Sequence, residues 1–297
     1  MSERAISILL CTRDRAAGLA QCLEKLDQDA ILRHGGELLI VDNGSSDRTP
    51  EIIAGFGHTA RIPVRAIHEP CPGLSHARNA GLALCAGRII VFLDDDVYLA
   101  DGYLDVVMRT LPTSEFAFAG GRITNFDPTE SLYGTNRQET FEFIPARSFL
   151  RTGRFQGTNL VMRREVYEKI GGFDATFGPG TPFRGDDIDY CARASQAGFA
   201  SAHLPELLVY HHHGRKPGQQ RDALARSNAI AGGAYYMSFV LRGACWRYLH
   251  GWLGTVQLRQ WRRFVWEIYG ACLYCRQRLS AGRVRPPAAA PQAALAR

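Results

Sequence analysis

The chain has 297 residues, of which 46% are hydrophobic, so it can bury a full core as one large domain or two small ones. The formal charge of +6 is uneven, because residues 215–297 carry 14 Lys and Arg against 2 Asp and Glu, while the part before them is net acidic. The first residues lead directly into a strand pattern without a charged start and an apolar core, so we expect no signal peptide and a cytoplasmic protein.

Short apolar runs alternate with helical patterns through the first hundred residues. Strands are predicted at residues 5–11, 37–41, 62–68 and 88–93. Helices are predicted at residues 19–26, from residue 49 onward, and at residues 75–86. This alternation predicts right-handed β-α-β units and therefore an α/β protein, whose mostly parallel mixed sheet has helices on both faces.

Polar side chains stand at the carboxyl ends of three of the predicted strands. They are Thr12 and Asp14, Asp42 and Asn43, and the consecutive Asp94, Asp95 and Asp96. Ligands of parallel sheets bind outside these strand ends, so we expect the three groups to line one crevice. Three adjacent carboxylates repel one another, which favours a hard divalent cation with oxygen ligands; the alternative is a solvated turn.

Six segments, in this order, resemble the family 2 glycosyltransferases and cover about residues 5–214. They are residues 6–15, 39–49, 72–81, 91–96, 157–174 and 185–191. Six ordered segments are a specific signal, whereas any one alone is weak. The resemblance implies a GT-A fold, a nucleotide-diphospho-sugar donor, a divalent metal (Mn²⁺ or Mg²⁺) and transfer with inversion.

The same resemblance, carried over position by position, implies roles for the polar strand ends. Thr12 and Asp42 would hold the nucleoside base, and Arg78 would lie near the nucleotide. Asp94 would meet the ribose or the sugar, and Asp95 would belong to the same donor site.

Asp96 would bind the metal at the pyrophosphate, where a Lewis acid offsets the charge that develops on the leaving nucleoside diphosphate. The sequence departs from the family pattern after Thr12, where an aromatic residue and Asn are common but Arg13 and Asp14 stand. Arg13 is expected to stack on the base or to pair with phosphate, or else to be a solvated loop residue. Asp14 stays in the predicted donor site.

Residues 116–123 predict another strand. Residues 125–155 follow it, lack strong periodicity and are rich in polar and aromatic side chains. Such a segment is typical of a lid or a specificity element, so we expect it on the acceptor side.

The polar loop at residues 185–189 contains three aspartates and leads into a predicted helix. Asp187 matches the second acid of the family's Glu-Asp pair, whose first position is Asp186 here. The resemblance therefore implies that Asp187 is the general base that takes the proton of the acceptor hydroxyl, a role worth roughly 10²–10⁴ in rate. The alternative is that these acids only favour the positive end of a helix, worth about 0.3–1 kcal/mol each.

Residues 207–213 predict a strand that ends in three histidines. Alternation with a period of two places His211 and His213 on one face and His212 on the other. In similar enzymes the first histidine after this strand is the usual metal candidate. His211 is therefore predicted to join Asp96 as a nitrogen ligand, which favours Mn²⁺ over Mg²⁺. Alternatively, all three histidines bind phosphate, solvent or carbonyl groups.

The final 80 residues lie outside the resemblance. Aromatic residues interleave with arginines in predicted helices at residues 223–241, 245–258 and 264–279. None reaches the roughly 18 to 20 uninterrupted apolar residues of a spanning helix. Two interpretations stay open: an interfacial element that contacts an anionic membrane, or an ordinary helical subdomain packed on the catalytic domain.

Taken together, the sequence predicts a metal-dependent inverting glycosyltransferase that moves a sugar to a hydroxyl of a saccharide or lipid-linked saccharide, in bacterial surface polysaccharide synthesis. Residues 1–214 would form the catalytic domain, residues 215–282 a basic aromatic helical extension, and residues 283–297 a disordered Pro- and Ala-rich tail. We expect peripheral contact with the inner face of the cytoplasmic membrane and no nucleic-acid partner.

Two other functions stay open. A nucleotidyltransferase that makes nucleotide-sugars would show a Gly-rich basic phosphate loop near the first strand, and residues 12–18 fit this poorly. No G-x-G-x-x-G follows the first strand and no G-x-x-x-x-G-K-S/T occurs, which disfavours nicotinamide-dinucleotide and P-loop sites. A non-catalytic sugar- or nucleic-acid-binding module would use its acids for Ca²⁺ and its basic tail for polyanions.

Overall fold

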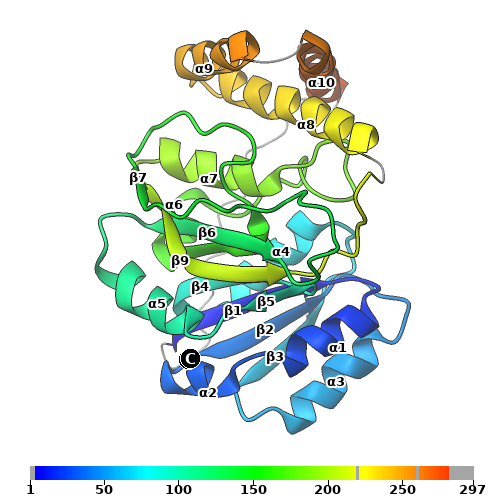
Figure 1. Ribbon diagram of the computed structural model, residues 1–297, viewed down its shortest axis with the longest axis vertical. Coiled ribbons are helices and arrows are strands. Elements are labelled where there is room, and N and C mark those ends of the chain that lie inside the picture. The colour runs from blue at the N-terminus through cyan, green and yellow to red at the C-terminus, as the bar shows by residue number, and fades with distance from the viewer. Residues whose placement is uncertain (1–3, 219–220, 259–260, 281–297) are drawn as a thin grey trace, which may run out of the picture.

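The computed structural model describes residues 4–218, 221–258 and 261–280 (Figure 1). The predicted disordered tail at residues 283–297 lies outside the described residues. The catalytic-domain boundary expected after residue 214 stays a prediction.

The described strands form one nine-stranded mixed sheet in the order β3-β2-β1-β4-β8-β6-β9-β5, with β7 paired to β9. Four of the six predicted strands form its parallel half: β1 (Arg4–Thr12), β2 (Glu37–Asp42), β3 (Val64–His68) and β4 (Gly87–Asp94). The remaining strands are β5 (Val97–Leu99), β6 (Phe118–Asn125), β7 (Glu142–Ile144), β8 (Leu160–Arg163) and β9 (Ser201–His211). The predicted mixed α/β sheet is confirmed, and its antiparallel pairs lie beyond β4.

The strand register brings the polar strand ends to one edge. Thr12 at the end of β1 pairs with Asp42 at the end of β2. Cys11, one residue earlier, pairs with Asp94 at the end of β4. Because these strands are parallel, the side chains that follow them share one edge of the sheet, as the sequence predicted.

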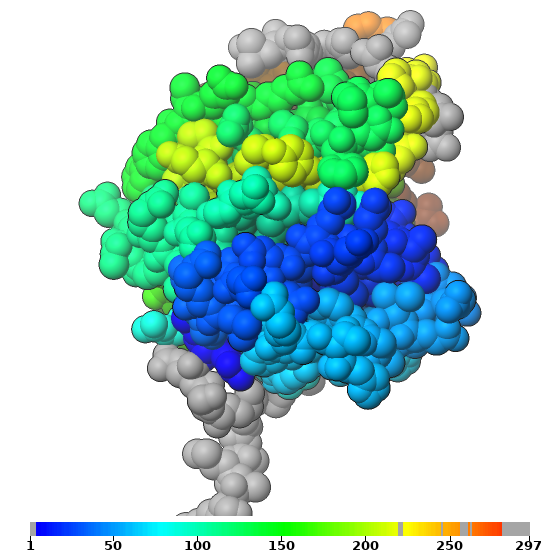
Figure 2. All heavy atoms as spheres, turned by 60° about the horizontal axis from the view of Figure 1, so that its bottom comes forward, coloured from blue at the N-terminus to red at the C-terminus, as the bar shows by residue number. Residues whose placement is uncertain are grey.

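Helices cover both faces of the sheet, and alternate residues of each strand enter two separate cores. In β1, Ile8 and Leu10 face one core, while Leu9 and Cys11 face the other. The first core is covered by α1 (Ala16–Glu24), α2 (Gln28–Arg33), α3 (Thr49–Thr59) and α5 (Tyr103–Thr110). The second is covered by α4 (Leu74–Leu84), α6 (Arg164–Ile170) and α7 (Asp186–Gln196). Figure 2 shows α1 and α3, in blue shades, as the surface of one end of the molecule.

Three helices follow the last strand, as predicted: α8 (Arg221–Leu241), α9 (Cys245–Leu258) and α10 (Trp261–Ser280). They lie beyond α7 at the end of the molecule opposite α1 and α3 (Figure 1). Tyr235, Phe239 and Tyr248 are buried and belong to the same core as α4, α6 and α7. The subdomain interpretation therefore holds for the inner side of these helices. None of the described helices combines the length and apolar character needed to cross a bilayer.

Candidate active site

Asp95 is the buried centre of the acid cluster that follows β4. Thr12 Oγ1 donates to its Oδ2 at 2.6 Å, and Arg15 Nε donates to its Oδ1 at 3.2 Å. Burial raises the pKa of Asp95 to about 6, although the hydrogen bond from Thr12 and the charge of Arg15 oppose the shift. Both carboxylate oxygens are engaged within the protein, so Asp95 holds Thr12 and Arg15 at the strand ends.

Asp96 faces His211 across the edge of the sheet. Its Oδ2 accepts a hydrogen bond of 2.6 Å from Arg15 Nη2, and its Oδ1 lies 3.4 Å from His211 Nε2. Its backbone carbonyl accepts from the N–H of His212, which ties the turn after β4 to the end of β9. Burial acts to raise the pKa of Asp96, but the contact with His211 and the charge of Arg15 outweigh it and lower the pKa. Asp96 is therefore kept ionised.

Asp96 and His211 fit two neighbouring ligands of one divalent ion. Adjacent ligands of an octahedral ion with bonds of about 2.1 Å lie about 3 Å apart, close to the observed 3.4 Å between Oδ1 and Nε2. The other ring nitrogen of His211, Nδ1, is buried and has no hydrogen-bond partner in the part of the chain described. Among the described residues no group of three or more His, Cys, Asp or Glu side chains is placed to hold a metal ion.

The other two histidines lie near Glu130, an acid that could not be predicted as a site residue because it lies in a long aperiodic segment. Its Oε1 lies 3.0 Å from His212 Nδ1, and its Oε2 lies 3.7 Å from His213 Nδ1. Glu130 is buried. His213 is held by the backbone, since its Nδ1 accepts from the N–H of Arg215 at 3.0 Å and its Nε2 lies 3.0 Å from the carbonyl oxygen of Ser131. Of the three histidines, His211 is the one that faces Asp96.

Asp14 and Asp42 brace the loops around the sheet edge. Asp42 Oδ1 accepts from the N–H of Ser45 at 3.0 Å in the turn after β2. Asp14 has a φ of +52°, and its Oδ1 accepts from the N–H of Ser46 at 2.6 Å. The donor contacts assigned to Asp14, Asp42 and Thr12 stay predictions.

Arg78 joins the first acid cluster to the second. It lies on α4 and is only 3% exposed. Its Nη1 donates to Asp186 Oδ2 at 2.6 Å, and its Nη2 donates to Asp94 Oδ1 at 3.3 Å. The guanidinium also lies over the rings of Phe92 and Phe173, with its carbon 5.7 and 5.2 Å from their centroids. A single cation thus holds the end of β4 against the start of α7.

Asp187, the second residue of α7, has no cationic hydrogen-bond partner among the described residues. Its Oδ2 accepts from the N–H of Gly157 at 2.9 Å, and its Oδ1 accepts from the N–H of Ile188 at 2.7 Å. Gly157 is required there, because a Cβ would lie 2.5 Å from Arg78 Nη2. Burial and the neighbouring charge of Asp186 raise the pKa of Asp187 to about 6. Asp187 is therefore the acid of this helix best suited to accept a proton near neutral pH.

Asp189, the third acid of this segment, has a structural role. It is fully buried, and its oxygens accept from Arg193 Nε at 2.8 Å and from Arg242 Nη1 at 2.7 Å. Burial acts to raise the pKa of Asp189, but the charges of Arg193 and Arg242 outweigh it and lower the pKa. Because Arg242 follows α8, this ion pair fastens the C-terminal helices to the helix that carries Asp187.

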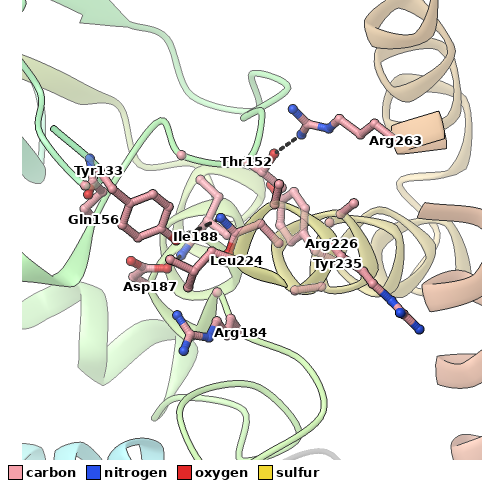
Figure 3. A pocket seen from close by; sticks show the side chains of 18 of the residues that line it. Tyr133, Thr152, Gln156, Arg184, Asp187, Ile188, Leu224, Arg226, Tyr235 and Arg263 are labelled. Carbon is pink, nitrogen blue, oxygen red and sulfur yellow. Dashed lines mark hydrogen bonds between the residues drawn. The ribbon is translucent and has the colours of Figure 1, made fainter. Parts of the chain in front are cut away.

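A cleft of about 1080 Å³ opens in front of Asp187 (Figure 3). Three parts of the chain line it: the segment between β6 and β8, the start of α7, and helices α8 and α10. Asn228 on α8 donates to the Tyr133 hydroxyl at 2.8 Å, and Arg263 on α10 donates to Thr152 Oγ1 at 3.3 Å. The aperiodic segment at residues 125–155 is thus fixed to the C-terminal helices. The segment and the helices both border the space next to Asp187.

A second hollow, of about 470 Å³, lies at the edge of the sheet. Its lining includes Asp14, Arg15, Asp96 and His212. Arg15 was not among the sequence-predicted site residues, because only the fold brings it to Asp95 and Asp96, about 80 positions along the chain. The structure therefore has one hollow at each of its two acid clusters.

Comparison with known proteins gives a family. The model of glycosyl transferase family 2 matches residues 7–171. Glycosyltransferase AglE of Haloferax volcanii is 26% identical over 212 residues, which are 69% of this chain and 66% of that protein. The pre-mycofactocin glycosyltransferase of Mycobacterium tuberculosis is 26% identical over 245 residues, 78% of this chain and 47% of that protein. The chain thus spans between about half and two thirds of the length of these relatives.

Solved structures share the fold. The mannosyltransferase PcManGT of Pyrobaculum calidifontis, in complex with GDP-Man and Mn²⁺, aligns with a TM-score of 0.61 at 17% identity over 96% of this chain and 77% of its own. TarS of S. aureus, residues 1–349 in complex with UDP-GlcNAc, aligns with a TM-score of 0.57 at 13% identity over 93% of this chain and 83% of its own. The chain has a GT-A fold and belongs to glycosyl transferase family 2.

Proposed function

We propose that this protein is an inverting glycosyltransferase that moves a sugar from a nucleotide-diphospho-sugar to a hydroxyl of a saccharide or lipid-linked saccharide. The observation that carries the proposal is the bridge made by Arg78, which binds Asp94 and Asp186. This bridge holds the end of β4 against the start of α7, where Asp187 lies. A donor bound at the sheet edge would therefore lie next to an acceptor bound in the cleft.

The donor would bind at the sheet edge, with its pyrophosphate beside Asp96, which lines the hollow there. Thr12 and Asp42 would hold the base, and Asp94 would contact the ribose or sugar. Asp96 and His211 would hold a divalent ion, which supplies Lewis-acid stabilisation of the pyrophosphate when bound. Two solved relatives of the fold, bound to GDP-Man with Mn²⁺ and to UDP-GlcNAc, support this class of donor.

Asp187 would act as the general base. The acceptor oxygen attacks the anomeric carbon as the bond from that carbon to the leaving phosphate oxygen breaks on the opposite face, which inverts the configuration. The hydroxyl proton moves to a carboxylate oxygen of Asp187. Gly157 and Ile188 hold this carboxylate through their backbone N–H groups, so its orientation is fixed before the acceptor binds.

The acceptor would occupy the cleft in front of Asp187. Tyr133, Gln156, Asn228 and Trp266 line it, and such polar and aromatic side chains suit a saccharide ring. We propose bacterial surface polysaccharide synthesis as the pathway, with the acceptor presented at the inner face of the cytoplasmic membrane.

Thermal-shift and transfer assays with UDP-, GDP- and dTDP-sugars, each with and without Mn²⁺, test the proposal. We expect one donor class to raise the melting temperature only when Mn²⁺ is present, since ligands that bind the folded state stabilise it. We also expect release of the nucleoside diphosphate with inversion at the anomeric carbon. Binding of saccharides without any nucleotide-sugar would favour a non-catalytic module, and formation of nucleotide-sugar from nucleoside triphosphate would favour a nucleotidyltransferase.

A further inference from the structure

Helix α10 has apolar residues on two opposite sides. Its inner side packs on α8 so closely that a Cβ on Gly270 would overlap the backbone of Ile230, and its Tyr274 is buried. The opposite side carries Val265, Ile268 and Leu279, which are 52%, 41% and 83% exposed. Their spacing of three and eleven residues places them on one stripe of the helix. Apolar residues on the solvent side of a helix that already packs through its other side are candidates for contact with a partner.

The stripe is part of a larger apolar surface. Among the described residues, eight of the fifteen large hydrophobic side chains that are exposed lie between residues 241 and 279. We call seven of them the outer face: Trp246, Leu253, Trp261, Val265, Ile268, Tyr269 and Leu279. They belong to α9 and α10, the outermost layer at this end of the molecule (Figure 1). Exposed large apolar side chains concentrated in one part of a chain indicate a candidate interaction site.

The charge around the outer face is positive. Arg247 on α9 and Arg276 on α10 are exposed. The only two acids after residue 214 are Asp222 and Glu267. Glu267 is buried, where it accepts from Trp252 Nε1 at 2.7 Å and from Arg263 Nε at 2.8 Å. The outer face therefore offers tryptophan, tyrosine and aliphatic side chains beside arginines, with almost no negative charge to repel an anion.

We propose that the outer face docks on an anionic lipid surface. Apolar and aromatic side chains enter the boundary between headgroups and acyl chains, while arginines bind the phosphates of the headgroups. A protein partner or nucleic acid explains the observations less well, because aromatic and aliphatic side chains next to arginines match both layers of a membrane surface.

Docking through the outer face would place the membrane near the acceptor cleft. The role of this cleft rests on the proposed function. Arg263 and Trp266 of α10 line the cleft, whereas Val265 and Ile268 belong to the outer face of the same helix. A membrane bound at the outer face would lie one helix away from the acceptor cleft. The saccharide of a lipid-linked acceptor could then reach Asp187 while its lipid stays in the bilayer.

Vesicle sedimentation of the full chain tests the docking. We expect the protein to sediment with vesicles of equal phosphatidylcholine and phosphatidylglycerol, to bind pure phosphatidylcholine vesicles more weakly, and to lose binding as salt is raised. The double substitution Val265→Glu and Ile268→Glu is expected to weaken binding at least about tenfold. Leu32→Glu, at an apolar residue of α2 that is 44% exposed, is the matched control and is expected to bind like the wild type.

Melting temperatures close to that of the wild type verify that the variants fold. The proposal is overturned if the wild type does not sediment with anionic vesicles, or if the double variant binds them as well as the wild type does. It is also overturned if ultracentrifugation shows a dimer that the double variant breaks, since the outer face would then belong to a second copy. Binding to duplex DNA but not to vesicles overturns it as well. None of these outcomes depends on catalytic activity. Failure of the proposed function would appear in the transfer assays and not in the vesicle test.

Discussion

Two clusters of three aspartates, built from the same residue type, have different surroundings. After β4, Asp95 and Asp96 contact the Arg15 guanidinium, and Asp96 also faces His211. At the start of α7, Asp187 has only backbone N–H donors. Under the proposed function, the first cluster would hold a cation, and the second would leave one carboxylate able to accept a proton. Surroundings rather than residue type divide the tasks.

Arg78 makes the two clusters depend on each other. It spans 108 positions of sequence to reach Asp186, and it also reaches Asp94. In each cluster it neutralises one acid, and the other acids are left for separate tasks. Substitutions on either side of Arg78 should therefore separate donor binding, proton transfer and stability.

Asp187→Asn is expected to have the largest effect. Asparagine keeps the shape of the side chain but cannot take the acceptor proton, so kcat should fall by roughly 10²–10⁴. Donor affinity should stay within about twofold, because the donor is proposed to bind at the other acid cluster. Steady-state transfer kinetics and donor calorimetry measure the two effects. Asp101→Asn, at an exposed acid before α5, is the control and should behave like the wild type.

Arg78→Met is expected to destabilise the fold. Removing a buried partner leaves Asp94 and Asp186 without their shared cation, which typically costs about 3–5 kcal/mol. Denaturant unfolding measures this loss. Arg48→Met removes an exposed ion pair with Glu51 and should leave the unfolding midpoint unchanged. Equal midpoints for both variants would contradict a structural role of the Arg78 bridge.

Asp96→Asn is expected to weaken the response to metal. Loss of one anionic ligand should raise the Mn²⁺ concentration needed for donor binding by at least about ten- to hundredfold. Titration of Mn²⁺ at fixed nucleotide-sugar, followed by calorimetry, gives this value. A variant that needs no more Mn²⁺ than the wild type would remove Asp96 from the ion site.

The pH profile should show the smallest effect. The raised pKa of Asp187, about 6, means that the carboxylate is protonated below this pH and cannot act as a base. Transfer should therefore fall as pH drops through about 6. Asp186→Asn removes a charge that raises the pKa of Asp187, so the acidic limb should move to lower pH. An unmoved or higher midpoint would show that another group controls the limb.

Much of the fold could be predicted from the sequence, because local patterns determine it. The apolar runs ending at Thr12, Asp42 and Asp94 gave the parallel half of the sheet, and parallel register then required one common edge. Apolar and aromatic spacing also gave α8, α9 and α10. Strands β5, β7 and β8 have three or four residues, too few for a period of two to be recognised.

The site could be predicted as a set of acids with Thr12, Arg78 and His211, but not as a set of contacts. The partners that give each acid its role are distant in sequence: Arg15 for Asp96, Arg78 for Asp186, and Arg242 for Asp189. An arginine carries no signal in the sequence that tells which acid it will contact in the fold. The aromatic residues of α8, α9 and α10 could not be assigned to a single role from the sequence, because some are buried in the core shared with α4, α6 and α7 and others form the outer face.

Donor binding and sugar transfer, measured together for Asp96→Asn and Asp187→Asn with the same nucleotide-sugar and Mn²⁺, test the division between the two clusters most directly. We expect Asp96→Asn to lose metal-dependent donor binding. We expect Asp187→Asn to bind donor like the wild type and to transfer at least about a hundredfold more slowly. Equal loss of binding in both variants, or full transfer by Asp187→Asn, would contradict the separate roles of Asp96 and Asp187.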